Sequence, residues 1–277
     1  MAKSNNDKKS FSELLLAKPG KKLRIADIDP SDTHGFDDKE KALVKLEKNL
    51  DKLAMLQYLL YAESKRSLLI VLQGIDAGGK DGTIRRVMTS FNPQGVKVNS
   101  FKVPAGEEKE HDYLWRIHKA VPGRGEVAIF NRSHYEEVLV VRVHNLVPKE
   151  IWSTRYDQIN AFEEMLAENG VHIVKFFLYI DKDEQKRRFQ ERIDDPSKNW
   201  KFSPADLEER KFWDDYMRAF EDAITNCSKK HAPWYVIPAN KKWFRNLAVS
   251  EILVETLEGM NLQYPKPAGD LSKIQFE

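Results

Sequence analysis

The sequence predicts an α/β fold in which one parallel β-sheet lies between layers of helices. Short apolar segments alternate along the chain with longer segments of helical periodicity, and the expected strands are apolar throughout. Continuously apolar strands are typical of parallel sheets that are covered on both faces. A glycine-rich loop, residues 74–82, also stands between the first strand and a helix, where such sheets bind ligands.

Composition limits the classes of function that the chain can have. The chain has 277 residues, a length that fits one large domain, and a net charge of +2, so any anion site has to be local. The single cysteine, Cys227, excludes a disulfide within the chain. No apolar run reaches transmembrane length, and the N-terminus lacks an apolar signal segment. We therefore expect a cytoplasmic protein that binds neither a membrane nor nucleic acid.

The elements can be assigned in order. Residues 1–37 are polar and rich in Lys, Gly and Pro, which predicts an irregular N-terminal extension before a single domain over 38–277. Residues 38–65 place six leucines at three- and four-residue steps and predict an amphipathic helix. Strands are expected at 68–73, 96–103, 126–131, 171–180 and 234–239. Helices are expected from about residue 79, around 107–120, after 131, and over 149–168, 182–194 and 242–260, with Gly170 closing the fourth of these.

A charged segment, residues 194–210, separates two strongly helical stretches. Ser203 is expected to cap the following helix, with Pro204 at its first position and Asp206 completing a variant capping box. The loop and the helix before it carry cations at Arg187, Arg188, Arg192, Lys198 and Lys201. This pattern predicts a mobile, cationic lid over about residues 182–210. Acidic residues are interleaved with these cations, so part of the segment could instead be a solvated, salt-bridged surface.

The loop between the first strand and its helix fits a phosphate-binding site. Gly74, Gly79 and Lys80 match the first seven positions of the Walker A pattern. Glycines allow consecutive backbone N–H groups to face one anion, and the helix N-terminus adds positive charge. Strand, spacing, lysine and helix are all in register, which favours phosphate binding over a simple packing turn. The remaining loop residues expected to contact phosphate are Ala77, Gly78, Asp81 and Gly82.

Two aspartates of this loop are unusual. Asp81 stands where the pattern normally has the Ser or Thr that binds Mg²⁺. It could bind a metal by another route, or it could be an acid favoured at a helix N-terminus, and the second reading is the simpler. Asp76 lies inside the loop, where a carboxylate would repel phosphate unless a metal ion or an acceptor group lay between them. Asp76 therefore predicts metal binding or orientation of the acceptor.

A second group of candidates follows the strand at 126–131. Asn131 ends the strand and can orient phosphate or water, although it is a poor sole ligand for Mg²⁺. Arg132 can bind phosphate through two hydrogen bonds. We expect this strand end to lie beside the phosphate loop, because it shares the carboxyl edge of the sheet. Glu136 and Glu137 follow on the next helix, and at least one of them could reach a metal ion. Aromatic residues near 113–115, 200 and 234–235 are candidates for stacking on a base.

Several longer motifs together resemble one known family. The segments GIDAGGKDGTI, FNRSHYEEVLVVRV, RIDDPSKNWKFSPADLEER and HAPWYVIPANKKWFRNLAV occur in order over most of the chain. They are similar to the polyphosphate kinase 2 family. The motif FNRSHYE and the length of a single domain resemble the class III branch of that family. The resemblance implies a P-loop kinase fold related to thymidylate kinases, with a helical lid. It also implies transfer of a terminal phosphoryl group between inorganic polyphosphate and ADP, and between polyphosphate and AMP.

The resemblance also assigns roles to residues. The loop aspartate of the family falls on Asp76 and its lysine on Lys80. The strand-end pair falls on Asn131 and Arg132, and the lid arginine on Arg192, with Asp206 as the nearby acid. Mg²⁺, or Mn²⁺ as an alternative, would be held near Asp76 and Glu137, and a row that includes Lys198 and Lys201 would hold the polyphosphate chain. Adenine nucleotides are the expected partners, with guanine nucleotides as an alternative, in a homo-oligomer that is a dimer or a tetramer.

Two other functions remain open at this point. An ATP-dependent nucleoside or nucleotide kinase would share the fold, but the missing Ser or Thr at 81 and the Asn at 131 argue against it. A non-catalytic binder of polyphosphate or nucleic acid is the other. The near-zero net charge and the combination of loop, strand end and lid argue against that reading.

Overall fold

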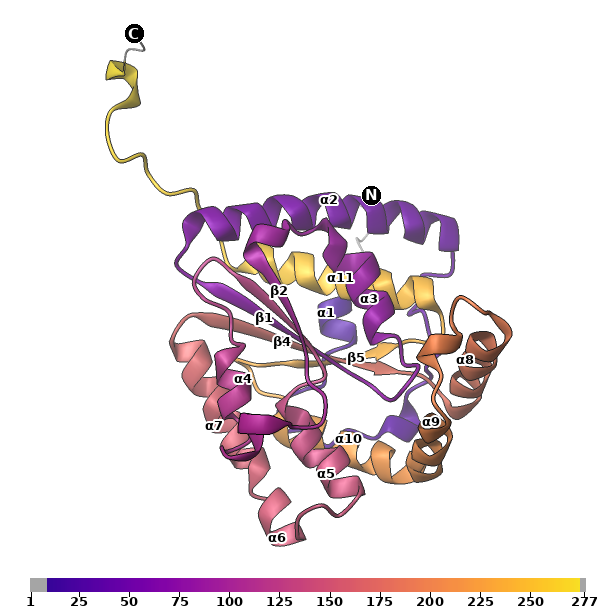
Figure 1. Cartoon of the computed structure of the whole chain (residues 1–277). Helices are drawn as coiled ribbons and strands as arrows, with labels where there is room; N and C mark the ends of the chain where they lie inside the picture. Colours follow the sequence, from indigo (N-terminus) through magenta and orange to yellow (C-terminus); the bar gives the residue numbers. More distant parts are fainter. Residues whose placement is uncertain (1–8, 275–277) are drawn as a thin grey trace, which may run out of the picture.

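The computed structural model describes residues 9–274 and contains one five-stranded β-sheet in the order β2-β3-β1-β4-β5. All four pairs of neighbouring strands are parallel, so the predicted fold class is confirmed. The strands are β1 Ser67–Gln73, β2 Val96–Ser100, β3 Val127–Asn131, β4 Val171–Tyr179 and β5 Trp234–Pro238. Figure 1 shows the sheet between two groups of helices.

The central strand β1 is buried on both faces, which explains its continuous apolar sequence. Leu68, Ile70 and Leu72 belong to one apolar cluster, whereas Leu69 and Val71 belong to the other. This alternation follows from the two-residue period of a strand. β1 pairs with β3 on one side and β4 on the other, so the loop after β1 lies at the middle of the sheet's carboxyl edge.

Two helical layers cover the sheet (Figure 1). One face carries α1 (Phe11–Leu14), α2 (Lys39–Glu63), α3 (Lys80–Val87) and α11 (Lys242–Gly259). The other face carries α4 (Trp115–Lys119), α5 (Val140–Val143), α7 (Arg155–Glu168) and α10 (Trp213–Cys227). α2 and α11 lie side by side, and the leucine stripe predicted for α2 supplies the contact through Leu46, Leu50, Leu53 and Leu60.

The N-terminal extension is irregular but is packed on the domain over its described residues. Phe11 meets Phe244 of α11 edge to face, with ring centroids 5.4 Å apart. Leu16 forms an isolated antiparallel bridge with Tyr235, and the Ala17 N–H donates to the Trp234 carbonyl over 2.9 Å. The extension therefore covers the outer edge of β5, which would otherwise present unpaired backbone groups.

Three expected elements differ from the structure. The helix expected around 107–120 is replaced by a short 3-10 turn, Gly106–Lys109, and the short α4. The expected helix 149–168 is divided into α6 (Lys149–Trp152) and α7, with Gly170 at φ +87° after its end as predicted. The helix after β3 is a 3-10 segment, His134–Val138, followed by α5, because Leu139 leaves the helical region at φ −109° and ψ −88°.

The predicted lid segment consists of α8 (Lys182–Asp194), a 3-10 turn (Asn199–Lys201) and α9 (Pro204–Glu209). Ser203 caps α9 by accepting a hydrogen bond from the Ala205 N–H over 3.3 Å. Asp206 forms an ion pair with Arg192. In Figure 1 the segment flanks the end of the sheet at which α3 begins. No helix in the described part of the chain is long and apolar enough to cross a membrane.

Candidate active site

The glycine-rich loop turns sharply from β1 into α3. Gly79 caps α3 at φ +111°, a region that residues with a side chain rarely adopt, and Ala77 is also left-handed at φ +61°. Gly74 lies against β4, where an added Cβ would be 2.9 Å from the Leu178 carbonyl oxygen. Gly79 is thus required for its backbone conformation, and Gly74 for its close approach to β4. The loop is therefore a tight turn packed against the carboxyl end of β4.

Lys80 begins α3 and lies under the loop, with only 9% of its surface exposed. Its Nζ donates to the carbonyl oxygens of Gly74 over 2.6 Å and Ile75 over 3.3 Å. Burial, together with the nearby Arg132 charge, lowers the pKa of the Lys80 ammonium to about 8. The ammonium meets carbonyl dipoles but no carboxylate within ion-pair distance in the described residues. An anion bound at the loop would supply the missing counter-charge.

The end of β3 lies beside the loop, as the sequence predicted. The Asn131 Nδ2 donates to the Asp81 carboxylate over 2.7 Å and ties the start of α3 to β3. The Arg132 Nη2 donates to the Asp76 carboxylate over 2.8 Å. Arg132 adopts φ +62°, an uncommon conformation for a residue with a side chain. The structure therefore brings four of the predicted residues, Asp76, Asp81, Asn131 and Arg132, into direct contact in two pairs.

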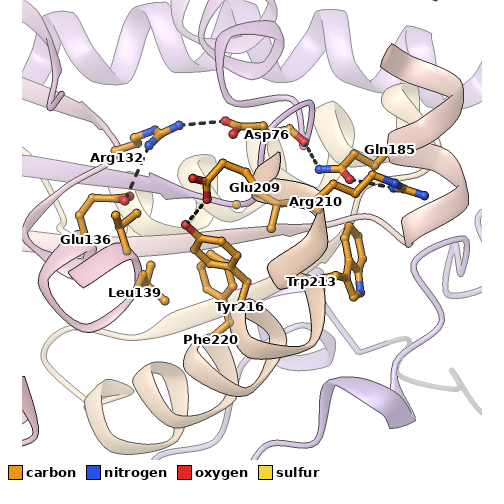
Figure 2. Close-up of a pocket in the computed structure, with 13 residues that line it drawn as sticks. Asp76, Arg132, Glu136, Leu139, Gln185, Glu209, Arg210, Trp213, Tyr216 and Phe220 are labelled. Atoms are coloured by element: carbon orange, nitrogen blue, oxygen red, sulfur yellow. Dashed lines mark hydrogen bonds and ion pairs between the residues drawn. The ribbon is translucent and has the colours of Figure 1, made fainter. Parts of the chain in front are cut away.

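Glu136 and Glu137 point in different directions. Glu136 lies near Arg132, with 3.8 Å between its carboxylate and Arg132 Nη1 (Figure 2). Burial raises the pKa of the Glu136 carboxyl, and Arg132 opposes this effect. Glu137 instead forms a short ion pair with Arg155 and lines neither cavity beside the loop. The structure thus places Glu136 beside the loop, whereas the carboxylate predicted near the metal was that of Glu137.

A cleft of about 620 Å³ opens above the loop and is strongly basic. Its lining contains ten Lys and Arg side chains against three carboxylates, Asp76, Asp81 and Glu191. The cleft is also lined by Arg192, Lys198 and Lys201 of the predicted lid segment. These three residues were predicted to bind the phosphate chain, and they face the same cleft as the loop. The other basic residues of the lining are Lys80, Arg85, Lys102, Arg132, Arg188, Lys242 and Arg245. The excess of positive charge suits a ligand that carries several negative charges.

The lid cations are partly paired within the lid. The Arg192 Nη1 lies 3.4 Å from the Asp206 carboxylate and donates to the Lys201 carbonyl over 3.1 Å. Lys198 pairs with Asp195 on the exposed surface. Arg187 pairs with Glu184 and Glu191 and does not line the cleft. The interleaved acids therefore neutralise part of the lid, but Arg192, Lys198 and Lys201 still face the cleft.

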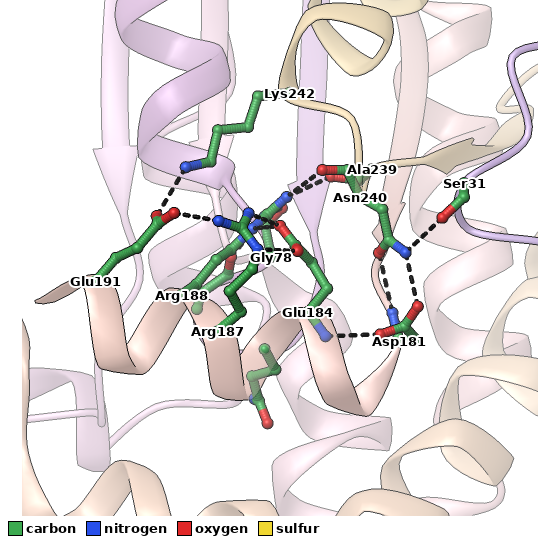
Figure 3. Close-up of polar contacts among 12 residues, drawn as sticks. Ser31, Gly78, Asp181, Glu184, Arg187, Arg188, Glu191, Ala239, Asn240 and Lys242 are labelled. Atoms are coloured by element: carbon green, nitrogen blue, oxygen red, sulfur yellow. Dashed lines mark hydrogen bonds and ion pairs between the residues drawn. The ribbon is translucent and has the colours of Figure 1, made fainter.

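Arg188 and Gln185 of α8 both contact the loop, and the Gln185 Nε2 donates to the Asp76 carbonyl over 3.0 Å. The Arg188 side chain is buried and its Nη1 donates to the carbonyl oxygens of Ala77 over 2.8 Å and Gly78 over 3.0 Å. Its Nε donates to Glu184 over 2.6 Å, and its Nη2 reaches the Ala239 and Asn240 carbonyls beyond β5 (Figure 3). This arginine fastens the base of α8 to the loop. In the sequence, Arg188 lies four residues before Arg192, and this spacing places both arginines on the same face of the helix.

Four further basic residues of the cleft were not identified from the sequence. Arg85 lies on α3, Lys242 and Arg245 come from the first turn of α11, and Lys102 follows β2. The last three lie beyond the carboxyl ends of strands. The rule that ligands bind at this edge could have indicated them. Nothing in the local sequence separates them from ordinary surface cations.

A second, small cavity of about 40 Å³ shares Asp76 and Arg132 with the basic cleft (Figure 2). Its apolar wall comes from α5 and α10 and includes Trp213, Tyr216 and Phe220. The Tyr216 hydroxyl donates to Glu209 over 2.8 Å. None of the aromatic residues near 113–115, 200 or 234–235 lines this cavity or the basic cleft; Trp234 and Tyr235 are buried in the core.

The carboxylates at the loop suit a metal ion that is held mainly by phosphate oxygens. Among residues 9–274, no group of three or more His, Cys, Asp or Glu side chains is arranged to hold a metal. Asp76 and Asp81 are nevertheless adjacent to the loop and line the cleft. Mg²⁺ is typically bound by one or two carboxylates, substrate phosphates and water. The donor set therefore fits such an ion.

A buried lysine in a glycine-rich loop, with arginines from the end of β3 and from helix α8, defines a P-loop phosphotransferase. The family model described as polyphosphate kinase 2 matches residues 34–265, and the chain belongs to this family. It is therefore an enzyme that transfers phosphoryl groups between polyphosphate and nucleotides, and enzymes of this family generally depend on a divalent metal ion.

Individual relatives support the same assignment. A protein from Meiothermus ruber, named AMP/ADP-polyphosphate phosphotransferase, is 55% identical over 260 residues, which cover 94% of this chain and 97% of the relative. A protein from Rhodopseudomonas palustris, named ADP-polyphosphate phosphotransferase, is 46% identical over 243 residues, or 83% and 84% of the two chains. The crystal structure of polyphosphate kinase 2 from Arthrobacter aurescens TC1 superposes with a TM-score of 0.92 at 44% identity, covering 95% of this chain and 94% of that one.

Proposed function

We propose that this protein transfers the terminal phosphoryl group of inorganic polyphosphate to ADP and to AMP, and catalyses the reverse reactions. The observation that carries the proposal is the basic cleft above the loop, in which ten cations face three carboxylates. Polyphosphate bears one negative charge on each internal phosphate, so it requires a row of cations. The relative that shares 55% of its aligned residues is named for AMP and ADP as acceptors, which supports both substrates here.

The transfer exchanges one P–O bond for another. The bond between the terminal phosphorus of the chain and its bridging oxygen breaks, and a bond forms from that phosphorus to a phosphate oxygen of the acceptor. Positioning and neutralisation of negative charge supply most of the catalysis in such reactions. Lys80, at the end of the loop, and Arg132, which pairs with the loop residue Asp76, would neutralise the transferred group. Arg192, Lys198 and Lys201 would hold the following phosphates of the chain.

Asp76 is the residue that we assign to the junction of donor and acceptor. It lines both the basic cleft and the small cavity, and it pairs with Arg132. We propose Mg²⁺ as the metal, held by Asp76 together with phosphate oxygens, with Mn²⁺ as an alternative. When bound, the ion would neutralise charge on the donor and acceptor oxygens. Asp81 and Glu136 are the other carboxylates within the same surroundings.

The acceptor nucleotide would enter from the side of the small cavity. Its aromatic wall, Trp213, Tyr216 and Phe220, offers faces for a base, and it adjoins Asp76 and Arg132, where the acceptor phosphate has to lie. The present volume of about 40 Å³ is too small for adenine, so binding requires the side chains on this wall to move. Adenine nucleotides are the proposed acceptors, with guanine nucleotides as an alternative.

The proposed function is tested by nucleotide analysis. Purified protein is mixed with Mg²⁺, long-chain polyphosphate and either AMP or ADP, without ATP. We expect ADP to form from AMP and ATP to form from ADP, and both products to disappear in Lys80→Ala. No transfer from polyphosphate, together with transfer from added ATP to a nucleoside or monophosphate, would replace the proposal with an ordinary nucleotide kinase.

The proposal also includes a homo-oligomer, a dimer or a tetramer, in the cytoplasm, where nucleotides are available. The outer face of α2 supports self-association, because Val44, Met55 and Tyr58 are apolar and more than half exposed. Light scattering during size-exclusion chromatography measures the mass directly. A monomer at micromolar concentration would contradict this part of the proposal.

A further inference from the structure

Arg245 lies directly behind the phosphate loop, although it comes from α11, far from the loop in sequence. Only 3% of its surface is exposed. A Cβ added to Gly79 would lie 1.9 Å from the Arg245 Nη1, and a Cβ added to Gly82 would lie 3.2 Å from its Nη2. The guanidinium therefore occupies the space that side chains at these two positions would need. The absence of side chains at Gly79 and Gly82 leaves room for the Arg245 guanidinium beside the loop.

The charge of Arg245 has no negative partner among the described residues. Its Nε and Nη2 both donate to the neutral side chain of Asn246, over 3.1 and 2.9 Å, and no carboxylate lies within ion-pair distance. The neighbouring charge is the guanidinium of Arg188, which is also positive. Burial and the Arg188 charge lower the pKa of the Arg245 guanidinium to about 9, so it remains charged at neutral pH.

Arg188 provides an internal comparison. It lies against the same loop, but it has Glu184 as an ion-pair partner, and backbone carbonyls accept from both its Nη atoms. Arg188 is thus satisfied by the protein itself, whereas Nη1 of Arg245 has no hydrogen-bond partner in the described part of the chain. A buried charge without a partner is strongly unfavourable unless something else neutralises it. Arg245 lines the basic cleft, so a ligand in the cleft can do so.

We propose that Arg245 is a further phosphate-binding residue of the cleft, and that its charge is neutralised by bound polyphosphate. The guanidinium reaches the loop at Gly79, and its Nη1, which has no hydrogen-bond partner among the described residues, remains available to a ligand in the cleft. Planar guanidinium groups bind phosphate oxygens through directed hydrogen bonds, which a lysine cannot reproduce. This inference rests on the proposed donor, polyphosphate, and adds to its site a residue from outside the loop and lid motifs.

The test compares Arg245→Met with Lys241→Met, which removes an exposed cation at the start of the same helix. Binding of long-chain polyphosphate is measured by calorimetry at fixed ionic strength, and melting temperature is measured with and without polyphosphate. We expect Arg245→Met to bind polyphosphate at least fivefold more weakly than wild type. Its melting temperature without ligand should be no lower than that of wild type, and polyphosphate should raise this temperature much less than it does in wild type. In Arg245→Met, the KM for polyphosphate should also rise, whereas the KM for ADP should stay within twofold of wild type.

Affinity of Arg245→Met within fivefold of wild type would overturn the proposal, whatever its stability. If Arg245→Met does not fold, Arg245→Gln is measured in the same way against the same threshold. Failure of both variants to fold would also overturn the proposal, because the arginine would then be needed for the fold in the absence of ligand. The wild-type titration separates this inference from the proposed function: wild type that neither binds polyphosphate nor transfers from it contradicts the function itself.

Discussion

Two of the places where charged side chains are buried lie beneath the phosphate loop and between β4 and α7. In the second place, Lys175 of β4 and Glu163 of α7 form a fully buried ion pair. The Lys175 Nζ also donates to the Tyr135 hydroxyl and the Cys227 carbonyl, each over 2.8 Å. Glu163 accepts from the Tyr135 hydroxyl over 3.0 Å and lies 3.1 Å from the His134 ring. Positive and negative charge are balanced in this network.

The loop region is arranged in the opposite way. Lys80 meets only carbonyl oxygens, Arg245 meets only Asn246, and both have their pKa lowered chiefly by burial. Burial also lowers the pKa of Lys175, but there the carboxylate of Glu163 opposes this effect, and Lys175 and His134 hold the pKa of Glu163 below its ordinary value although burial alone would raise it. The difference indicates that buried charge balanced by the protein serves the fold, whereas buried charge left unbalanced serves a ligand. The predictions below test this distinction.

The largest effect is expected from removing the unbalanced lysine. Lys80→Met should lower kcat for transfer from polyphosphate to ADP by about 10²–10³-fold, since Lys80 neutralises charge that develops on the transferred group. Steady-state kinetics with ADP and polyphosphate measure the loss, with Lys241→Met as the control that keeps wild-type rates. A Lys80→Met enzyme with a kcat within tenfold of wild type would remove this lysine from the chemistry.

Breaking the balanced pair should instead affect the fold. Glu163→Gln leaves Lys175 charged and unpaired, and we expect it to lower the free energy of unfolding by about 3–5 kcal/mol. Urea unfolding measures this change, and the exposed neighbour Glu164→Gln is the matched control. In the folded protein, the KM for polyphosphate should stay within twofold of wild type. A Glu163→Gln protein of normal stability but weak polyphosphate binding would reverse the assignment.

The two glycines that face Arg245 should respond differently. Gly79→Ala forces a side chain into φ +111° and toward the Arg245 Nη1, so we expect a loss of about 1–3 kcal/mol and weakened polyphosphate binding. Gly82→Ala lies inside α3, where alanine is favoured by about 1 kcal/mol and the contact with Arg245 is 3.2 Å. Its stability should change little. Unfolding and binding measured on both variants distinguish the two positions, and equal effects would contradict this geometry.

The smallest effect is a pH dependence. The pKa of Lys80 is about 8 without ligand, and a bound polyanion favours the charged form. Polyphosphate binding without metal should therefore weaken as pH rises from 7 to 9, by about tenfold, as the ligand-free lysine loses its proton. Calorimetry at each pH measures the affinity. The slope should fall to about twofold in Lys80→Met, because Arg245 has a pKa of about 9 and loses half of its charge by pH 9. An unchanged slope would assign the titration to another group.

Local motifs explain why part of this site could be predicted from the sequence. Lys80 and Arg132 follow strands that pair with each other, so their positions depend only on the loop pattern and on the edge of the sheet. Arg245 was not predicted, because its place behind the loop depends on how α11 packs. Glu136 and Glu137 are adjacent, and the 3-10 geometry that directs one toward Arg132 and the other toward Arg155 has no clear sequence signal.

The fold, like the site, could be predicted only where a local sequence pattern determines the structure. The continuous apolar strands and the leucine stripe of α2 predicted the sheet and the longest helix, because both patterns follow from burial of a whole face. The segment around 107–120 has many charges and no apolar stripe. It folds into short turns that are held by side-chain contacts such as the Asp112 carboxylate accepting from the Leu114 N–H over 2.9 Å.

The distinction between unbalanced and balanced charge is tested most directly by unfolding Lys80→Met and Lys175→Met in urea side by side, each with and without long-chain polyphosphate. We predict that Lys175→Met loses about 3–5 kcal/mol and keeps the wild-type gain on adding polyphosphate. Without ligand, Lys80→Met should lower the free energy of unfolding by less than about 1 kcal/mol, which is the net value of a typical hydrogen bond. With polyphosphate, most of the stabilisation that the ligand gives to wild type should be absent from Lys80→Met. Equal losses of stability, with the polyphosphate gain retained in both variants, would contradict the account.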